Sequence, residues 1–255
     1  MRKNNSNLFW PLENLKEISL LRKFKIDTAE ITSCWQMIDL ASDALQKKIK
    51  RTHISSLAII SSKAIIEGDV IIEDGVRVLE HAKIIGPAYL GKDVIIGNSV
   101  LVRKSYIGEG CVVGYMTDIT RSCIGTNCWF SRAHIADSFL DNDVCLGSGT
   151  VLASLRLDGN FVSVQVKGEK VPTDRTKLGV IIGKRTQIGA NVVILPGKRI
   201  GKDCMVGAGV VVSEDIKDNQ YCKVFQKLAY RKNIFSCKSS VYQELKRNLL
   251  QELSL

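Results

Sequence analysis

Aliphatic residues recur at every sixth position over a long stretch that begins at Ile54. A period of six matches neither the 3.6-residue turn of an α-helix nor the two-residue alternation of a long strand. It indicates a prism with three short flat sides in each coil, with the aliphatic residues pointing inward and small residues filling the corners. The first nine members of the series are Ile54, Ile60, Ile66, Ile72, Val78, Ile84, Leu90, Ile96 and Val102.

The series continues beyond Val102 with one-residue shifts, because five-residue turns interrupt the six-residue ones. Glycine and asparagine often follow the aliphatic residue, which suits tight corners where a positive φ is common. Stacked coils hydrogen-bond to one another and bury a continuous aliphatic column. The pattern therefore predicts a mainly β protein, a left-handed parallel β-helix over residues 54–217. Its later members are Ile107, Val113, Ile119, Ile124, Phe130, Ile135, Leu140, Leu146 and Leu152, and then Ile182, Ile188, Ile194, Ile200, Val206 and Val212.

Three segments lie outside the repeat. Residues 1–53 carry mixed apolar and basic patterns and predict a helical segment. Residues 153–181 break the period and predict an excursion loop with its own strand pair, and such a loop on a rigid scaffold often carries function. Residues 218–255 predict a basic helical tail, in which Ser240 and Gln243 form a capping box. We expect the terminal helices to pack against the β-helix or a neighbouring subunit.

Composition restricts the classes of protein further. The 255 residues are 45% hydrophobic, enough for one main domain. No apolar run reaches the ~20 residues of a membrane span, and the N-terminus does not resemble a signal peptide. None of the eight cysteines forms a C-x-x-C pair, so we expect no metal site and free thiols in a reducing cytoplasm. Four cysteines are predicted at small inward positions of the repeat: Cys111, Cys123, Cys128 and Cys204.

The net charge is +10, and half of it lies in the last 39 residues. A basic tail is compatible with a solvated helical face, and also with binding to nucleic acid, a membrane or an acidic partner. No nucleic-acid-binding motif accompanies it, so we expect no nucleic-acid partner.

Several motifs resemble the C-terminal domain of bifunctional sugar-1-phosphate nucleotidyltransferase/N-acetyltransferases: VGYMTDITRS, LGSGTVLASLRLDG, VQVKGEKVPTDRTKLGVIIG and ILPGKRIG. The resemblance covers roughly residues 54–217. It implies a homotrimer, acetyl-CoA in the groove between two β-helices, and a histidine that acts as general base on a sugar amine. The sequence has no nucleotide-binding glycine-rich loop followed by an alternating αβ pattern, so pyrophosphorylase activity is not expected.

The catalytic turn differs from the family pattern, which is aliphatic-Pro-His-x-x-Tyr. The matching turn here, residues 130–134, has five residues instead of six. When the two turns are aligned at their first residue, the family's histidine corresponds to Arg132. When they are aligned at their last residue, the histidine corresponds to Ser131 and the tyrosine to His134. The family's asparagine falls on Ser154, and its lysines fall on Asn160 and Ser163.

Two interpretations of His134 stay open. It is the one nearby group able to act as a base near neutral pH without a shifted pKa, or it fills the small inward position of a degenerate turn. Arg132, Arg156 and Lys167 are candidates to hold a phosphate, with Asn160 beside them. Small residues in three glycine-containing corners, Ser148, Ala190 and Ala208, would allow coenzyme A to approach the backbone, although corner geometry alone also accounts for these positions.

The residues and the resemblance together predict an acyltransferase that acetylates an amino-sugar phosphate or a nucleotide sugar with acetyl-CoA, without a metal. The alternative is a non-catalytic trimeric β-helix that binds a nucleotide sugar or coenzyme A, or acts as a scaffold.

Overall fold

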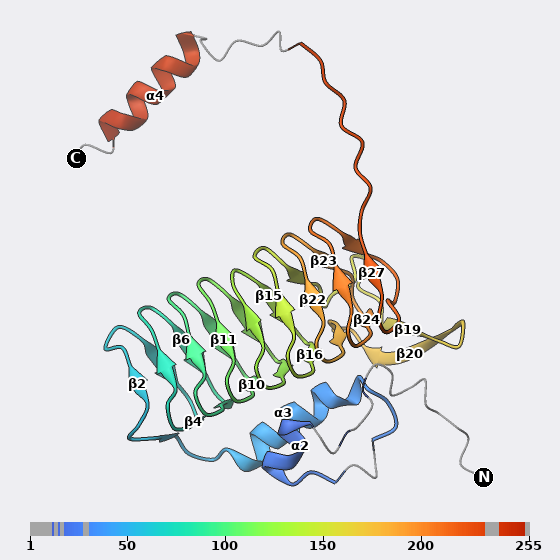
Figure 1. The fold of residues 1–255 in the computed structure, drawn as a ribbon. Helices are drawn as coiled ribbons and strands as arrows, with labels where there is room; N and C mark the ends of the chain where they lie inside the picture. Colours follow the sequence, from blue (N-terminus) through green and yellow to red (C-terminus); the bar gives the residue numbers. More distant parts are fainter. Residues whose placement is uncertain (1–11, 13–14, 16–17, 28–30, 233–239, 253–255) are drawn as a thin grey trace. The chain divides into compact units, whose positions relative to one another are not determined.

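The computed structural model describes residues 12, 15, 18–27, 31–232 and 240–252. From β1 (His53–Ile54) to β27 (Tyr221–Cys222) the chain winds as a parallel β-helix, and most coils add one strand to each of three sheets, A, B and C (Figure 1).

Sheet A contains β1, β4 (Val70–Ile72), β7 (Ala88–Leu90), β10 (Tyr106–Ile107), β13 (Cys123–Ile124), β16 (Phe139–Leu140), β21 (Ile181–Ile182) and β24 (Arg199–Ile200). Sheet B contains β2 (Ile59–Ile60), β5 (Arg77–Val78), β8 (Ile95–Ile96), β11 (Val112–Val113), β14 (Trp129–Phe130), β17 (Cys145–Leu146), β22 (Gln187–Ile188), β25 (Met205–Val206) and β27. Sheet C contains β3 (Ile65–Glu67), β6 (Lys83–Ile85), β9 (Leu101–Arg103), β12 (Asp118–Thr120), β15 (His134–Ala136), β18 (Val151–Leu152), β23 (Val193–Ile194) and β26 (Val211–Val212).

The predicted aliphatic series forms the interior of the coils. From Ile72 to Val212 its members are buried in one continuous cluster. Only the first coil, which has a neighbouring coil on one side, leaves its members partly open, and Ile54 is 41% exposed there. The fold class predicted from the six-residue period is therefore confirmed as a parallel β-helix.

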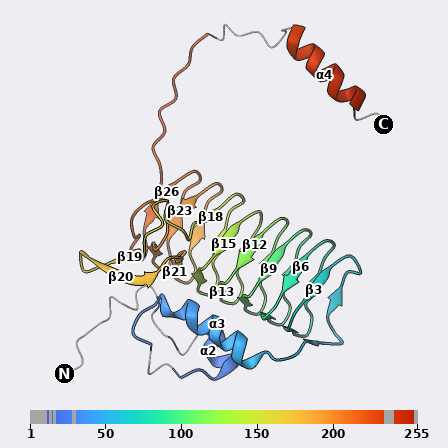
Figure 2. The ribbon, with the colours of Figure 1, turned by 180° about the vertical axis from the view of Figure 1, so that it is seen from behind.

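A second core lies on the outer face of sheet A. Helices α2 (Ser19–Phe24) and α3 (Gln36–Lys48) run along this face in both views (Figures 1 and 2) and bury its outward side chains. The rings of Tyr89 and Tyr106 stack at 4.8 Å on adjacent strands, and the edge of Phe24 meets Tyr89 at 5.7 Å. The N-terminal helices thus cover one of the three faces of the prism.

The buried cysteines divide between these two cores. Cys111, Cys128 and Cys204 point into the coils as predicted, but the prediction for Cys123 is wrong. Cys123 precedes the inward Ile124, pairs in register with Tyr106 and Phe139, and lies under the helices. The small inward position of its turn is taken by Ser122, which is 2% exposed.

Thiol labelling of the native protein should distinguish buried from partly open cysteines. Burial raises the pKa of Cys34 to about 12 and also raises that of Cys123, so neither thiol has appreciable access or thiolate character. We expect Cys145 and Cys222, which are partly exposed, to react well before either of them. Mass spectrometry of alkylated peptides with and without denaturant measures this order, and fast native labelling of Cys123 would contradict the described packing.

The excursion between β18 and β21 forms an antiparallel hairpin of β19 (Val162–Val166) and β20 (Glu169–Arg175). Residues from 225 onward form a second compact unit, which contains α4 (Ser240–Glu252). Among the helices of the described residues, none is long and apolar enough to cross a membrane.

Candidate functional site

The coil that carries His134 is short at one corner. Three residues, 131–133, connect the paired positions of sheets B and C, whereas the coils before and after use four, 114–117 and 147–150. Ala133, 3% exposed, occupies the inward position that Thr117 and Thr150 hold in the neighbouring coils. His134 therefore points outward with a side chain 48% exposed, which excludes the interpretation that it fills the inward position.

The imidazole of His134 lies beside a carboxylate on the next strand. Asp118 pairs in register with His134, and its Oδ2 is 3.4 Å from Nδ1 of the imidazole. The other carboxylate oxygen, Oδ1, accepts a hydrogen bond of 2.9 Å from Oγ1 of Thr120, and Arg103 approaches Oδ2 at 3.9 Å. One carboxylate thus orients the histidine and is itself held by a hydroxyl and a guanidinium.

The contact between Asp118 and His134 shifts the pKa values of both groups, each toward its charged form. The Asp118 carboxylate raises the pKa of His134, although partial burial of the imidazole opposes the shift. The same contact, helped by Thr120, lowers the pKa of Asp118. Because Nδ1 faces the carboxylate, the neutral imidazole keeps its proton there and presents Nε2 as a proton acceptor.

Two polar atoms next to this pair have no hydrogen-bond partner among the described residues. They are Nε of Arg103 and Oγ1 of Thr117. In the coil after the short corner, the equivalent hydroxyl of Thr150 donates to the carbonyls of Gly147 and Gly189 at 2.7 and 3.2 Å. The shortened corner 131–133 is the one that follows the corner of Thr117 in the next coil. Buried polar groups without a partner are rare, and here the hydroxyl of Thr117 faces the interior of the coils.

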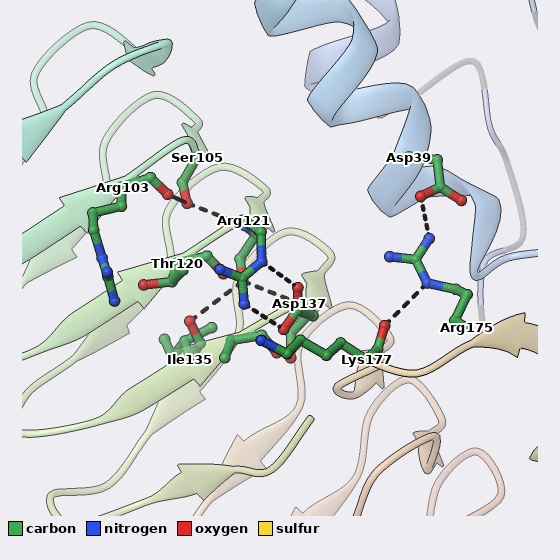
Figure 3. A network of polar contacts seen from close by, with 12 residues as sticks. Asp39, Arg103, Ser105, Thr120, Arg121, Ile135, Asp137, Arg175 and Lys177 are labelled. Carbon is green, nitrogen blue, oxygen red and sulfur yellow. Dashed lines mark hydrogen bonds and ion pairs between the residues drawn. The ribbon is translucent and has the colours of Figure 1, made fainter. Parts of the chain in front are cut away.

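A polar cleft lies around the next corner, between sheets C and A. Its volume is about 470 Å³, and it is lined by Asp39, Arg121, Asp137 and residues 173–177. Arg121 forms a two-point ion pair with Asp137 (Figure 3). Its Nε and Nη2 donate to the two carboxylate oxygens at 2.6 and 2.8 Å. Arg175 of the hairpin pairs with Asp39 of α3 in the same view. Helix, hairpin and β-helix therefore meet at this cleft.

The cleft and the histidine interact electrostatically. The charge of Asp137 helps to raise the pKa of His134, and that of Asp118 helps to raise the pKa of Arg121. The side chain of Asp137 is almost fully buried, at 4% exposed, while that of Arg121 is 40% exposed. Cationic donors and a proton acceptor are thus close on one side of the β-helix.

The other predicted catalytic residues lie at the corners that flank β15 and β18. Ser131 and Arg132 form the short corner itself, and Arg132 adopts a left-handed φ of 50°. Ser154 lies where the excursion leaves sheet C, and its carbonyl accepts a hydrogen bond of 2.9 Å from the backbone N–H of Leu178.

The predicted phosphate-binding residues are not gathered in one place. Arg156 forms an ion pair with Asp158, and Asp158 also accepts a hydrogen bond of 3.2 Å from the backbone N–H of Asn160. Lys167 lies in the hairpin turn and lines a separate cavity of about 660 Å³ together with Arg199 and Asp215. Of the three cations predicted to hold a phosphate, Arg132 is the one that lies in the same corner as the residues leading to His134.

The three residues predicted beside coenzyme A share one ridge. Ser148 O accepts a hydrogen bond from Asn191 N, and Ala190 O accepts one from Gly209 N, both at 2.9 Å, so Ser148, Ala190 and Ala208 lie in successive coils. The neighbouring glycines are required by packing, since a Cβ on Gly147 would lie 2.5 Å from the backbone nitrogen of Ala190. The ridge joins sheets B and C, and the short corner belongs to it.

Sequence reasoning missed Asp118, Arg103 and the Arg121–Asp137 pair. A signal was present, because both Asp118–His134 and Arg121–Asp137 are separated by sixteen residues, the length of the short coil. Among the described residues, no group of three or more His, Cys, Asp or Glu side chains has the arrangement of a metal site.

Comparisons with known proteins agree with the repeat. Residues 179–214 match the family model "Bacterial transferase hexapeptide (six repeats)". The chain is 40% identical over 92 residues, 36% of its length, to a bifunctional sugar-1-phosphate nucleotidylyltransferase/acetyltransferase of Sulfurisphaera tokodaii. It is 30% identical over 143 residues, 56% of its length, to the bifunctional protein GlmU of Methanocaldococcus jannaschii.

These matches span only 23% and 31% of the two relatives. Among solved structures, the Arabidopsis UDP-N-acetylglucosamine acyltransferase is similar at 18% identity and a TM-score of 0.43, over 67% of this chain and 72% of that one. The family model and the two relatives show that the chain carries the hexapeptide repeat and resembles the acetyltransferase part of such bifunctional enzymes.

Proposed function

We propose that this protein is an acyltransferase that transfers an acetyl group from acetyl-CoA to the amine of an amino-sugar phosphate or a nucleotide sugar. The observation that carries the proposal is the Asp118–His134 pair on the outer face of sheet C, beside the short corner. Similarity to proteins with an acetyltransferase function supports the reaction class. The acceptor class rests on the resemblance and on the cationic groups around the pair.

In the proposed reaction, the acceptor amine attacks the thioester carbonyl of acetyl-CoA. The new C–N bond forms, the C–S bond breaks, and Nε2 of His134 removes the proton from the attacking nitrogen. That proton then passes to the departing thiolate, which leaves as coenzyme A thiol. Asp118 keeps the imidazole in the reactive tautomer and stabilises the imidazolium that forms.

Cations near the pair suit an acceptor that carries phosphate. Arg103 lies 3.9 Å from the Asp118 carboxylate, Arg132 precedes His134 by two residues, and Arg121, 40% exposed, lines the adjacent cleft. A guanidinium binds phosphate oxygens through paired N–H donors. Arg156 and Lys167 remain candidates only if the excursion reaches a neighbouring subunit's site.

The site is proposed to be completed in a homotrimer. Helices α2 and α3 already cover sheet A, so the outer faces of sheets B and C are the ones available for neighbouring copies. Exposed apolar side chains lie on both faces, and the ridge of Ser148, Ala190 and Ala208 runs between them. These side chains are Ile59, Trp129, Met205 and Tyr221 on sheet B, and Ile65 and Val211 on sheet C.

Light scattering in dilute solution should give three times the 28.2 kDa of one chain. Trp129→Glu should lower that mass, because it places a charge on a face proposed to be buried between copies. A monomeric mass for the unaltered protein would contradict the trimer and the inter-subunit site.

The reaction itself is tested by following acetyl-CoA consumption with glucosamine-1-phosphate, galactosamine-1-phosphate and amino nucleotide sugars across pH. Because the base must be neutral and its pKa is raised, activity should fall as the pH drops through a value above the ordinary histidine pKa of ~6.5. Turnover with any of these amines supports the proposal. Binding of acetyl-CoA without turnover would favour the non-catalytic ligand-binding alternative, and an absence of both would leave a scaffold.

A further inference from the structure

The C-terminal part of the chain combines positive charge with exposed apolar side chains. Between Asp218 and Glu244 the sequence contains five basic residues and no acidic one. Apolar residues alternate with these charges, and Leu228 and Tyr230 are 62% and 88% exposed. The five basic residues are Lys223, Lys227, Arg231, Lys232 and Lys238.

Helix α4 adds an apolar face to this basic stretch. Val241, Leu245 and Leu249 follow one another at intervals of four residues, so they lie on one side of the helix. All three are about half exposed or more. Lys246 and Arg247 lie on other sides of the helix and are balanced by Glu244 and Glu252, so α4 is amphipathic without a net charge and the positive charge lies in the stretch before it.

We propose that residues 223–232 and helix α4 bind the surface of an anionic lipid bilayer. The basic stretch would lie among the headgroups, and α4 would lie in the plane of the interface with its apolar face toward the acyl chains. With 13 residues, α4 is shorter than the ~20 residues needed to cross a bilayer, so the proposed contact is peripheral.

Charge and apolarity together favour this occupant over the alternatives. A second copy of the basic stretch would repel the first, because both carry the same excess of positive charge. A nucleic acid would satisfy the charge through its phosphates but offers no apolar phase to Leu245 and Leu249. A bilayer with anionic headgroups offers both.

The test uses the full chain and vesicles of phosphatidylcholine alone or of phosphatidylcholine mixed with phosphatidylglycerol, with binding measured by co-sedimentation. We expect binding to the mixed vesicles and much weaker binding to the neutral ones. The triple variant Lys227→Gln, Arg231→Gln and Lys232→Gln should bind the mixed vesicles about 100-fold more weakly, because each basic residue near such a surface contributes roughly fivefold.

The matched control is Lys48→Gln, Lys50→Gln and Arg51→Gln, which removes the same charge from exposed positions before the β-helix. It should keep most of the binding, and an equal loss in both triple variants would overturn the proposal in favour of non-specific attraction.

A second variant tests the apolar face. Leu245→Ser with Leu249→Ser should weaken binding to the mixed vesicles by at least about tenfold, since two buried leucines are lost from the interface. Undiminished vesicle binding by this variant would overturn the role of α4. A drop in the oligomeric mass of the same variant, without vesicle binding by the unaltered protein, would assign the face to contacts between copies instead.

Discussion

Replacing His134 by alanine should lower the rate of acetyl transfer by a factor of about 10²–10⁴, the usual effect of losing a general base. The fold should be unaffected, because the side chain is outward and half exposed while the adjacent Ala133 and Ile135 hold the coil. His53→Ala is the matched control, since His53 is an exposed histidine on strand β1. Initial rates are compared on proteins of equal oligomeric mass and equal thermal stability.

A substitution of Asp118, which contacts His134, tests the role of the histidine in a second way. Asp118→Asn keeps a side chain of similar shape but removes the charge that raises the pKa of the imidazole. The acid side of the pH profile should therefore move to lower pH, together with a loss of rate from the wrong tautomer. An unshifted profile would show that Asp118 does not orient the base, and full activity of His134→Ala would show that another group removes the proton.

The six-residue period predicted the β-helix because the signal is redundant. More than twenty inward positions repeat one chemical preference, so single exceptions such as Phe130 do not obscure it. The pattern could not reveal which outward faces are covered. Tyr89, Tyr106 and Cys123 look alike in sequence to other residues one place before the inward series, and only the helices packed on sheet A bury them.

The candidate site was only partly predictable for a related reason. His134 is conspicuous as a histidine in the catalytic turn. Whether its side chain points inward or outward depends on which corner of the coil is one residue shorter. The structure removes it from the corner between sheets B and C, so Ala133 points inward and His134 outward. The contact between Asp118 and His134 arises from the register between successive coils. Local sequence motifs do not reveal this register, whereas a separation of one coil length between two residues does.

The packing of the short coil has a measurable consequence for stability. Phe130 is 1% exposed, lies in the interior column between Val113 and Leu146, and is larger than either neighbour. Its replacement by alanine would leave a cavity that the coils above and below cannot easily fill, because their backbones are fixed by inter-coil hydrogen bonds on each side. We expect Phe130→Ala to reduce the free energy of unfolding by about 3–5 kcal/mol.

Urea unfolding at a fixed protein concentration measures this loss. Leu157→Ala serves as the control, since that side chain is fully exposed on the excursion and should change the free energy by no more than about 0.5 kcal/mol. Stacked repeats are stabilised through their nearest neighbours, so a cavity at Phe130 should also weaken the coupling between the coils on its two sides. A loss below about 1 kcal/mol would mean that Phe130 is not at the interior position described, and the outward placement of His134 four residues later would then be in doubt.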